Sequence, residues 1–205
     1  MNATVKTPML DVIGSEIQAS IAVKQAVLAD SALLQQVAQL AHACLKALRA
    51  GGKVIFAGNG GSFADAQHLS AEFTSRFMVD RAPLASLALG TNSSAISAIS
   101  NDYGYEAVFA RELQGIARPE DVFIPISTSG NSPNILEAVK MATELGVKTV
   151  AWTGESGGRL KLLCECICVP ANETARIQEC HIMVGHILCG LVEDEYFGRH
   201  GVKRL

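Results

Sequence analysis

Short apolar runs separated by amphipathic stretches recur along most of the chain. Residues 54–57 form such a run, as expected for a strand that is buried on both faces. Similar runs predict further strands at residues 83–89, 121–127, 147–153 and 165–169. Because helical segments separate these strands, the pattern predicts a five-stranded parallel sheet with helices on both faces, of the flavodoxin-like kind.

Two helices are predicted ahead of the first strand, at residues 11–29 and 31–50. Apolar residues recur at helical spacing in both, Asp30-Ser31 offers a break and a new cap, and Gly51-Gly52 ends the second helix. This N-terminal helical hairpin has no strand of its own to cover. We therefore expect a single domain over residues 1–205, with the hairpin (1–52) packed on the α/β core (53–205) or on a neighbouring subunit.

Later helices are predicted at residues 91–100, 106–117, 132–145 and 174–197. The third of these has Ser132 at the N-cap and Pro133 at the favoured first position.

The composition suits a well-buried protein that associates with copies of itself. The chain is 49% hydrophobic and 18% charged, and its formal charge of −3 comes with no basic stripe, which argues against nucleic-acid binding. No run of 18 apolar residues occurs, and residues 1–16 lack the basic start and apolar block of a signal peptide. We therefore expect a cytoplasmic protein without a membrane segment.

Six cysteines raise the alternatives of disulfides or a thiolate metal site. In a chain of this size with no sign of secretion, reduced and buried thiols are the better interpretation. Cys164, Cys166 and Cys168 alternate along a predicted strand and so share one face, where core packing is favoured over zinc because structural zinc sites use wider spacing.

A glycine-rich turn follows the first strand. Gly58, Gly60 and Gly61 allow a tight turn and close approach of a ligand to the main chain, and Ser62 is predicted to cap the next helix, with Asp65 in the capping-box position. The strand, turn and helix N-terminus together form a generic anion site.

A second polar loop, Ser127-Thr-Ser-Gly-Asn-Ser132, follows the third predicted strand. Its hydroxyls, main-chain N–H groups and helix dipole could hold a phosphate without a lysine. A plain polar turn is the alternative, but two such loops at corresponding strand ends favour a ligand site. Neither loop has the Gly-Lys-Ser/Thr of a Walker loop or the G-x-G-x-x-G dinucleotide motif, which disfavours ATP and NAD.

Two helices carry candidate ligands for a metal ion. His68 and Glu72 are four residues apart and share a helix face, and Gln178 and His186, eight residues apart on the last helix, could complete a set of four N/O ligands. His181 is turned from His186 by about 140°, so only one of these two histidines can easily join the site.

The chain resembles the sugar isomerase (SIS) domain family and, within it, the phosphoheptose isomerases. The likeness covers nearly the whole chain and is carried by these motifs: Gly58-Asn-Gly-Gly-Ser62, Asp65-Ala-Gln-His68 with Glu72, Arg76-Phe77, Asn101-Asp-Tyr-Gly104, Ile126-Ser-Thr-Ser-Gly-Asn-Ser132, Thr153-Gly154 with Gly157-Gly158, and Arg176-Ile-Gln-Glu179 with His186. The most specific part is the quartet of His68, Glu72, Gln178 and His186, which matches the family's zinc site.

The resemblance implies an isomerase that interconverts sedoheptulose 7-phosphate and D-glycero-D-manno-heptose 7-phosphate. It implies one Zn²⁺ per subunit on the quartet, and a homotetramer with active sites at subunit contacts. Glu72 and Gln178 would touch both metal and substrate. The other implied substrate contacts are Asn59, Gly60, Gly61, Ser62, Asn101, Asp102, Ser127, Thr128, Ser129 and Ser132. Ala175 stands where some family members carry an acidic residue, so no role of that residue is transferred.

Aldose–ketose isomerisation passes through an enediol and needs a base, an acid and stabilisation of a developing oxyanion. We assign Glu72 as the carbon base and His186 as the opposite proton carrier. Two alternatives are a non-catalytic SIS protein, which binds sugar phosphates or a replication initiator, and an isomerase for another sugar phosphate. The intact quartet argues against the non-catalytic alternative.

Overall fold

A parallel five-stranded sheet forms the centre of the molecule, in a computed structural model that describes residues 8–198. The strand order is β2-β1-β3-β4-β5, and every neighbouring pair is parallel. The strands are β1 (Val54–Gly58), β2 (Ser86–Ala88), β3 (Val122–Ile126), β4 (Lys148–Thr153) and β5 (Glu165–Cys168). The predicted five-stranded parallel sheet is thus confirmed.

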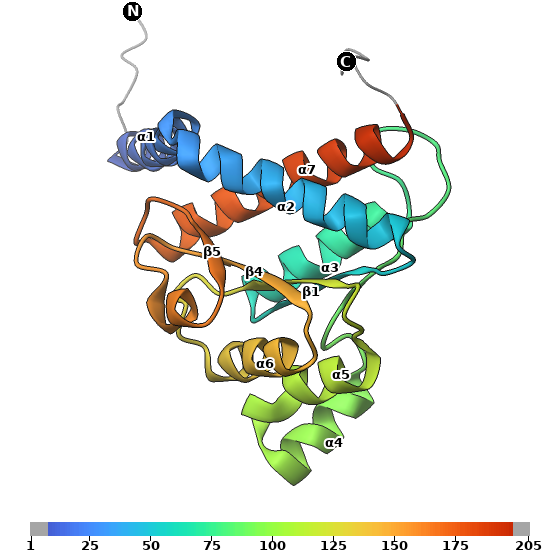
Figure 1. The fold of residues 1–205 in the computed structure, drawn as a ribbon. Helices are drawn as coiled ribbons and strands as arrows, with labels where there is room; N and C mark the ends of the chain where they lie inside the picture. The colour runs from blue at the N-terminus through green and yellow to red at the C-terminus, as the bar shows by residue number, and fades with distance from the viewer. Residues whose placement is uncertain (1–7, 199–205) are drawn as a thin grey trace, which may run out of the picture.

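Helices cover both faces of this sheet (Figure 1). One face packs against α2 (Ser31–Arg49), α3 (Gly61–Thr74) and α7 (Thr174–Tyr196). The other packs against α4 (Ser93–Tyr103), α5 (Val108–Ile116) and α6 (Pro133–Glu144). Short 3-10 turns, η1 (Tyr105–Ala107) and η2 (Gly158–Leu162), complete the elements. Every residue of β1 and β3 is buried, which explains their uniformly apolar sequences.

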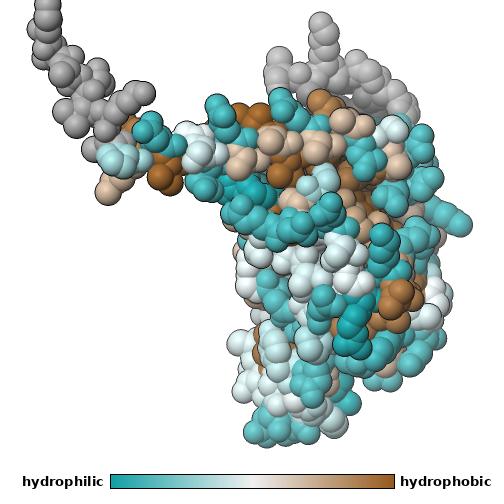
Figure 2. Space-filling view, turned by 90° about the vertical axis from the view of Figure 1, so that its left-hand side faces the viewer, coloured by the Kyte–Doolittle hydropathy of each residue, from teal (hydrophilic) through white to brown (hydrophobic). Residues whose placement is uncertain are grey.

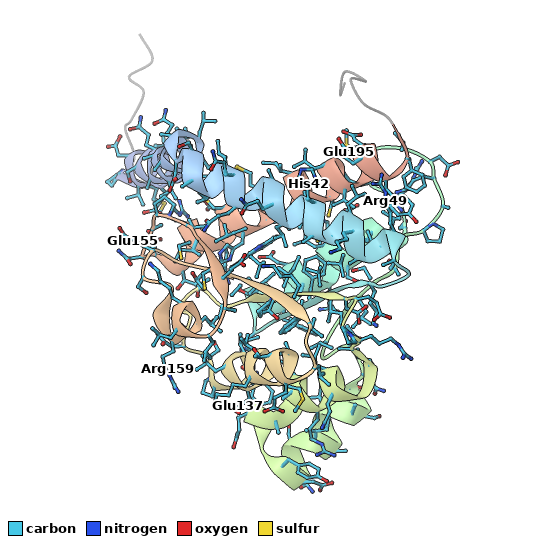
Figure 3. All side chains as sticks on the ribbon, in the orientation of Figure 1. His42, Arg49, Glu137, Glu155, Arg159 and Glu195 are labelled. Carbon is cyan, nitrogen blue, oxygen red and sulfur yellow. The ribbon has the colours of Figure 1, made fainter. Side chains whose placement is uncertain are left out.

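The N-terminal helices differ in how they pack. Asp30 caps α2 by accepting hydrogen bonds from two amides, as predicted, and the chain bends by 76° between α1 (Pro8–Ala29) and α2. Helix α2 lies on the sheet beside α7, and Arg49 Nη2 donates to the carbonyl oxygen of Glu195 at 2.9 Å, near the C-terminal ends of both helices (Figure 3). Helix α1 buries only Val27 among its residues.

Large apolar side chains are exposed along α1. They are Met9, Leu10, Val12, Ile13, Ile17, Ile21 and Leu28. Figure 2 shows apolar side chains on the arm that projects from the body next to the N-terminal residues. A hollow of about 370 Å³, lined mainly by apolar side chains of α1, α2 and α7, continues this surface. In residues 8–198 no single helix is long and apolar enough to cross a membrane; α1 and α2 meet that test only as a bent pair.

The cysteines are unpaired, including Cys164, Cys166 and Cys168. Cys164 and Cys166 pack against the apolar cluster on the α4–α6 face, which confirms the predicted packing role for these two. Cys168 instead accepts a 3.3 Å hydrogen bond at Sγ from the hydroxyl group of Thr153.

Candidate functional site

Helices α3 and α7 lie side by side and run in the same direction. Near the start of α7, the amide of Gln178 packs against the backbone of Gly61, the first residue of α3. Further along, Gly185 faces Leu69 so closely that a Cβ on the glycine would lie 2.5 Å from Leu69 Cδ2. Only glycine fits this contact without displacing Leu69, and the close approach brings the polar residues of the two helices together.

His68, Glu72 and His186 converge where these helices meet. The Nε2 atoms of His68 and His186 are 2.8 Å apart, and His68 Nε2 lies 3.3 Å from Glu72 Oε1. Each of the three residues offers one ligand atom, and these three atoms all lie within 4.8 Å of one another. The predicted pairing of the His68–Glu72 face with His186 is therefore realised, and the group can hold a metal ion. We call these residues the α3–α7 cluster.

Aromatic contacts fix the ring of His186. Phe77, just beyond α3, stacks on it with ring centroids 5.6 Å apart and an interplanar angle of 13°. The His68 ring meets the same imidazole edge-on, at 5.1 Å and 78°. His186 is thus held face-on by a phenyl ring and edge-on by the other histidine.

His181 lies in the core, away from the α3–α7 cluster. It is 1% exposed, and its Nε2 lies 3.2 Å from the carbonyl oxygen of Thr153. Burial lowers the pKa of His181 to about 4, so the imidazole is neutral near pH 7. The prediction that only one of the two histidines on α7 joins the site is confirmed.

Gln178 faces the beginning of α3. Its amide contacts Gly61, whereas His68 and Glu72 lie two to three turns further along that helix. The structure therefore places Gln178 beside the glycine-rich turn, at the N-terminal end of α3.

The loops after β1 and β3 meet at the point where the strand order reverses, because β1 and β3 are neighbours while β2 lies on the outer side of β1. Asn59 and Asn134 exchange two amide hydrogen bonds of 2.9 Å across this point. Tyr105 Oη donates a third, of 3.1 Å, to Asn59 Oδ1. The sequence did not reveal Asn134 or Tyr105, since nothing in the local pattern pairs either with Asn59.

The side chain of Asn59 is therefore already occupied by protein partners. It holds the glycine-rich turn in place and leaves the main chain of Gly60 and Gly61, both exposed, to face a ligand.

The predicted cap on α3 is wrong. The helix begins at Gly61 with Gly60 at the N-cap position, and Ser62 lies inside the first turn, 3% exposed. Gly60 has a φ of 55°, a conformation that lets the helix begin two residues earlier than a cap at Ser62 would allow. No side chain caps α3, and the amides of Ser62, Phe63 and Ala64 donate to the carbonyl oxygens of Asn59 and Gly60, so an anion here would be favoured by the helix dipole.

The loop after β3 has the same property. Ser132 stands at the N-cap position of α6 with Pro133 next, as predicted, but its side chain makes no capping bond. Its hydroxyl instead lies 3.0 Å from that of Ser127. Asn131 braces the loop by accepting a 3.0 Å hydrogen bond from the amide of Arg159, whose side chain points outward in Figure 3.

The remaining loop residues differ in exposure. Thr128 is half-buried and Ser129 is exposed, and the Ser129 hydroxyl accepts a hydrogen bond from the amide of Asn131. The hydroxyl groups of Ser127, Ser129 and Ser132 thus lie in the loop before α6, whose N-terminal dipole favours an anion.

Asn101 and Asp102 are not brought to the α3–α7 cluster within the chain. Both are exposed at the C-terminal end of α4, where Asn101 Nδ2 donates to Asp102 Oδ1 at 2.8 Å. Helix α4 lies on the opposite face of the sheet from α3 and α7.

Asp65 is a further polar group of α3, one turn before His68. Its Oδ2 is buried without a hydrogen-bond partner. Partial burial raises the pKa of Asp65 to about 6, against an opposing effect of His68. Sequence reasoning treated this residue as part of a capping box, which the structure does not contain.

Comparison with known proteins agrees with this geometry at two levels. The family model described as "SIS domain" matches residues 18–154, from the middle of α1 to the end of β4, which defines the class. A phosphoheptose isomerase from Aneurinibacillus thermoaerophilus is 53% identical over 190 residues, covering 92% of this chain and 96% of the relative. The chain belongs to the phosphoheptose isomerases, a family of SIS-domain proteins.

Solved structures of the family match the fold closely. A phosphoheptose isomerase from Neisseria gonorrhoeae superimposes with a TM-score of 0.85 at 38% identity, covering 91% of this chain and 99% of that one. One from Francisella tularensis gives a TM-score of 0.86 at 35% identity, covering 92% and 100%.

Proposed function

We propose that the protein is an aldose–ketose isomerase that converts sedoheptulose 7-phosphate into D-glycero-D-manno-heptose 7-phosphate. The observation that carries this proposal is the convergence of His68, Glu72 and His186 on α3 and α7, in a chain whose β1 and β3 end in polar loops at one edge of the sheet. A proton-transfer site beside an anion site suits a phosphorylated sugar. Relatives named phosphoheptose isomerase, about half identical to this chain, support the choice of substrate.

The phosphate occupies the loop after β3 in this proposal. Ser127, Thr128, Ser129 and Ser132 contribute hydroxyl or main-chain donors, and the dipole of α6 adds positive potential. The sugar then extends along the main chain of Asn59 to Gly61 toward Gln178 and the α3–α7 cluster.

Zinc fits the donor set of the site. Two imidazoles and a carboxylate are a ligand set that catalytic zinc uses, and the amide oxygen of Gln178 is the proposed fourth ligand. The Nε2 atoms of His68 and His186 are 2.8 Å apart, so both rings would have to move apart slightly to hold one ion. When bound, the ion supplies Lewis-acid stabilisation of negative charge on sugar oxygen.

The proton transfers fall to Glu72 and His186. The Glu72 carboxylate removes a proton from C1 of the ketose, giving the enediol, and returns it to C2. His186 carries the proton that leaves the C1 hydroxyl and reaches the C2 oxygen, so atoms and charge balance over the cycle. His68 holds the carboxylate through its 3.3 Å contact with Oε1.

Assembly and location complete the proposal. The exposed apolar residues of α1, with the adjoining hollow, suit burial against other copies in a homotetramer whose sites lie at subunit contacts. In such a homotetramer, Asn101 and Asp102 of one copy would contact the active site of a neighbouring copy. Unpaired cysteines accord with a cytoplasmic location.

The direct test is turnover of sedoheptulose 7-phosphate, followed with and without a chelator, together with metal analysis. Metal-dependent formation of the aldose is expected. No turnover and no bound metal would favour the non-catalytic alternative, and turnover of a different sugar phosphate alone would favour another isomerase.

A further inference from the structure

A buried ion pair closes the segment that follows α3. Arg81 Nε donates to Glu193 Oε2 at 2.7 Å, and the two side chains are 4% and 1% exposed. Glu193 is on α7, two turns beyond His186, whereas Arg81 lies in the irregular segment 75–85 between α3 and β2; we call residues 75–81 the strap.

Both partners bind main chain as well as each other. Arg81 donates to the carbonyl oxygens of Glu72 and Phe73 at 2.8 Å each, and more weakly to that of Ser75. These carbonyls belong to the last turn of α3, which lacks helical partners and attracts a cation. The guanidinium therefore anchors the turn that carries the Glu72 side chain.

Glu193 fixes the strap from the other side. Its Oε2 and Oε1 accept hydrogen bonds from the amides of Phe77 and Met78, at 3.2 and 2.9 Å. These two bonds set the backbone from which the Phe77 ring stacks on His186. One carboxylate thus connects the end of α3 to the ring plane of a cluster histidine.

A buried ion pair is not explained by stability alone. Desolvation of two charges cancels much of their attraction, and apolar replacements are often equally stable. Here most hydrogen bonds of the pair end on the last turn of α3, which carries Glu72, or on the strap, which carries the residue that stacks on His186. The arrangement fixes geometry at a place where small displacements matter for ligand binding.

We propose that the strap, clamped by Arg81 and Glu193, is a positioning device for the α3–α7 cluster: Arg81 places the Glu72 turn, and Phe77 sets the ring plane of His186. Arg81, Glu193 and Phe77 are positioning residues that act through Glu72 and His186. The effect of the strap on catalysis rests on the proposed function. The positions that the strap gives to Glu72 and His186 can be measured in the metal-free protein without assuming that function.

The first measurement follows the histidine Cε1–H signals by NMR in the metal-free, full-length protein. His186 is assigned with a His186→Gln variant, and exposed His42 on α2 is the internal reference. In the parent, the stacked phenyl ring shifts the His186 signal away from that of His42. The Glu193→Gln variant, which touches no atom of His186, is expected to move the His186 signal toward that of His42, and Phe77→Leu does so fully.

The second measurement is Zn²⁺ affinity, by competition with a chromophoric chelator. About a tenfold loss is expected for Phe77→Leu, and about 10- to 100-fold for Glu193→Gln. Phe77→Tyr keeps the ring and is expected to stay within about twofold of the parent. Met78→Leu, an exposed neighbour on the strap, is the matched control and is expected to change nothing.

The outcomes separate the two proposals. Parent-like His186 signals and Zn²⁺ affinity in Phe77→Leu would overturn the role of the strap even if Glu193→Gln fails to fold. Lack of sugar-phosphate turnover in the parent would overturn the proposed function, while the NMR comparison would still decide the role of the strap.

Discussion

The imidazole nitrogens of His68 and His186 lie 2.8 Å apart although the residues are separated by 118 positions in the chain. At that distance one ring nitrogen donates a proton and the other accepts it. A metal ion that binds both Nε2 atoms must replace this hydrogen bond, and the donor imidazole would then carry its proton on Nδ1. The relationship depends on how α3 and α7 pack, which can be tested by single substitutions.

Loss of His186 is expected to remove metal binding. His186→Ala leaves two of the three clustered ligands, and we expect Zn²⁺ affinity to fall about 100-fold or more. Loss of a residue that merely hydrogen-bonds a metal ligand already lowers metal affinity about 10- to 100-fold. Titration against a chromophoric chelator measures this. His42→Ala, an exposed histidine on α2, is the control; an equal loss in both variants would show that the zinc binds elsewhere.

Gly185→Ala tests the close approach of the two helices. The added methyl group meets Leu69 at 2.5 Å, which we expect to cost about 1–3 kcal/mol of unfolding free energy and to weaken zinc binding as the helices move apart. Gly115→Ala, in α5, is the matched control, because no atom lies within 4 Å of its added Cβ. That control is expected to be neutral or stabilised by about 0.5–1 kcal/mol. Denaturant unfolding of both variants gives the comparison, and equal stabilities would contradict the packing argument.

The phosphate subsite predicts a specific loss on removing one hydroxyl. Ser132→Ala deletes a donor to a charged ligand, so KM for the phosphorylated sugar is expected to rise about tenfold while kcat changes little. Ser86→Ala is the control, since its hydroxyl bonds the carbonyl of Val54 at the opposite, amino-terminal ends of the strands. Steady-state kinetics distinguish them, and an unchanged KM in Ser132→Ala would place the phosphate elsewhere.

His181 predicts a pH dependence of stability. Its pKa in the folded state is lowered to about 4 by burial, against 6.5 ordinarily, so the unfolded chain takes up the proton first as pH falls. The neutral His181 therefore makes its full contribution to the free energy of unfolding above pH 6.5. That contribution, about 3 kcal/mol at most, is lost as the pH falls from 6.5 to 4. His181→Gln keeps a donor for Thr153 and should flatten that part of the curve. Parallel slopes for parent and variant between pH 7 and 4.5 would contradict the assignment.

Local patterns carry most of the fold. Apolar runs identify the strands because the sheet is buried on both faces, and the i, i+4 spacing of His68 and Glu72 places both on one side of α3. Loops at the carboxyl ends of β1 and β3 were predictable for the same reason, since parallel strands end at one edge.

Long-range contacts were not predictable from those patterns. Ser62 matches the signal for a helix cap, yet Gly60, with its positive φ, takes the N-cap position and the helix begins before Ser62. Arg81 and Glu193 look like surface charges in the sequence, and only the tertiary packing shows that they are buried together. The pairing of Asn59 with Asn134 likewise joins the loop after β1 to the first turn of α6, 75 residues further along the chain.

The most direct test of the central claim is isomerisation of sedoheptulose 7-phosphate in D₂O by the parent and by Glu72→Gln. If Glu72 takes a proton from C1 and its carboxyl group exchanges that proton with D₂O before C2 of the enediol is protonated, the parent forms the aldose with deuterium at C2, detected by NMR. The Glu72→Gln protein then forms it at least about 100-fold more slowly, as expected on loss of a general base. Full turnover by Glu72→Gln, or no aldose from the metal-loaded parent, would contradict the account.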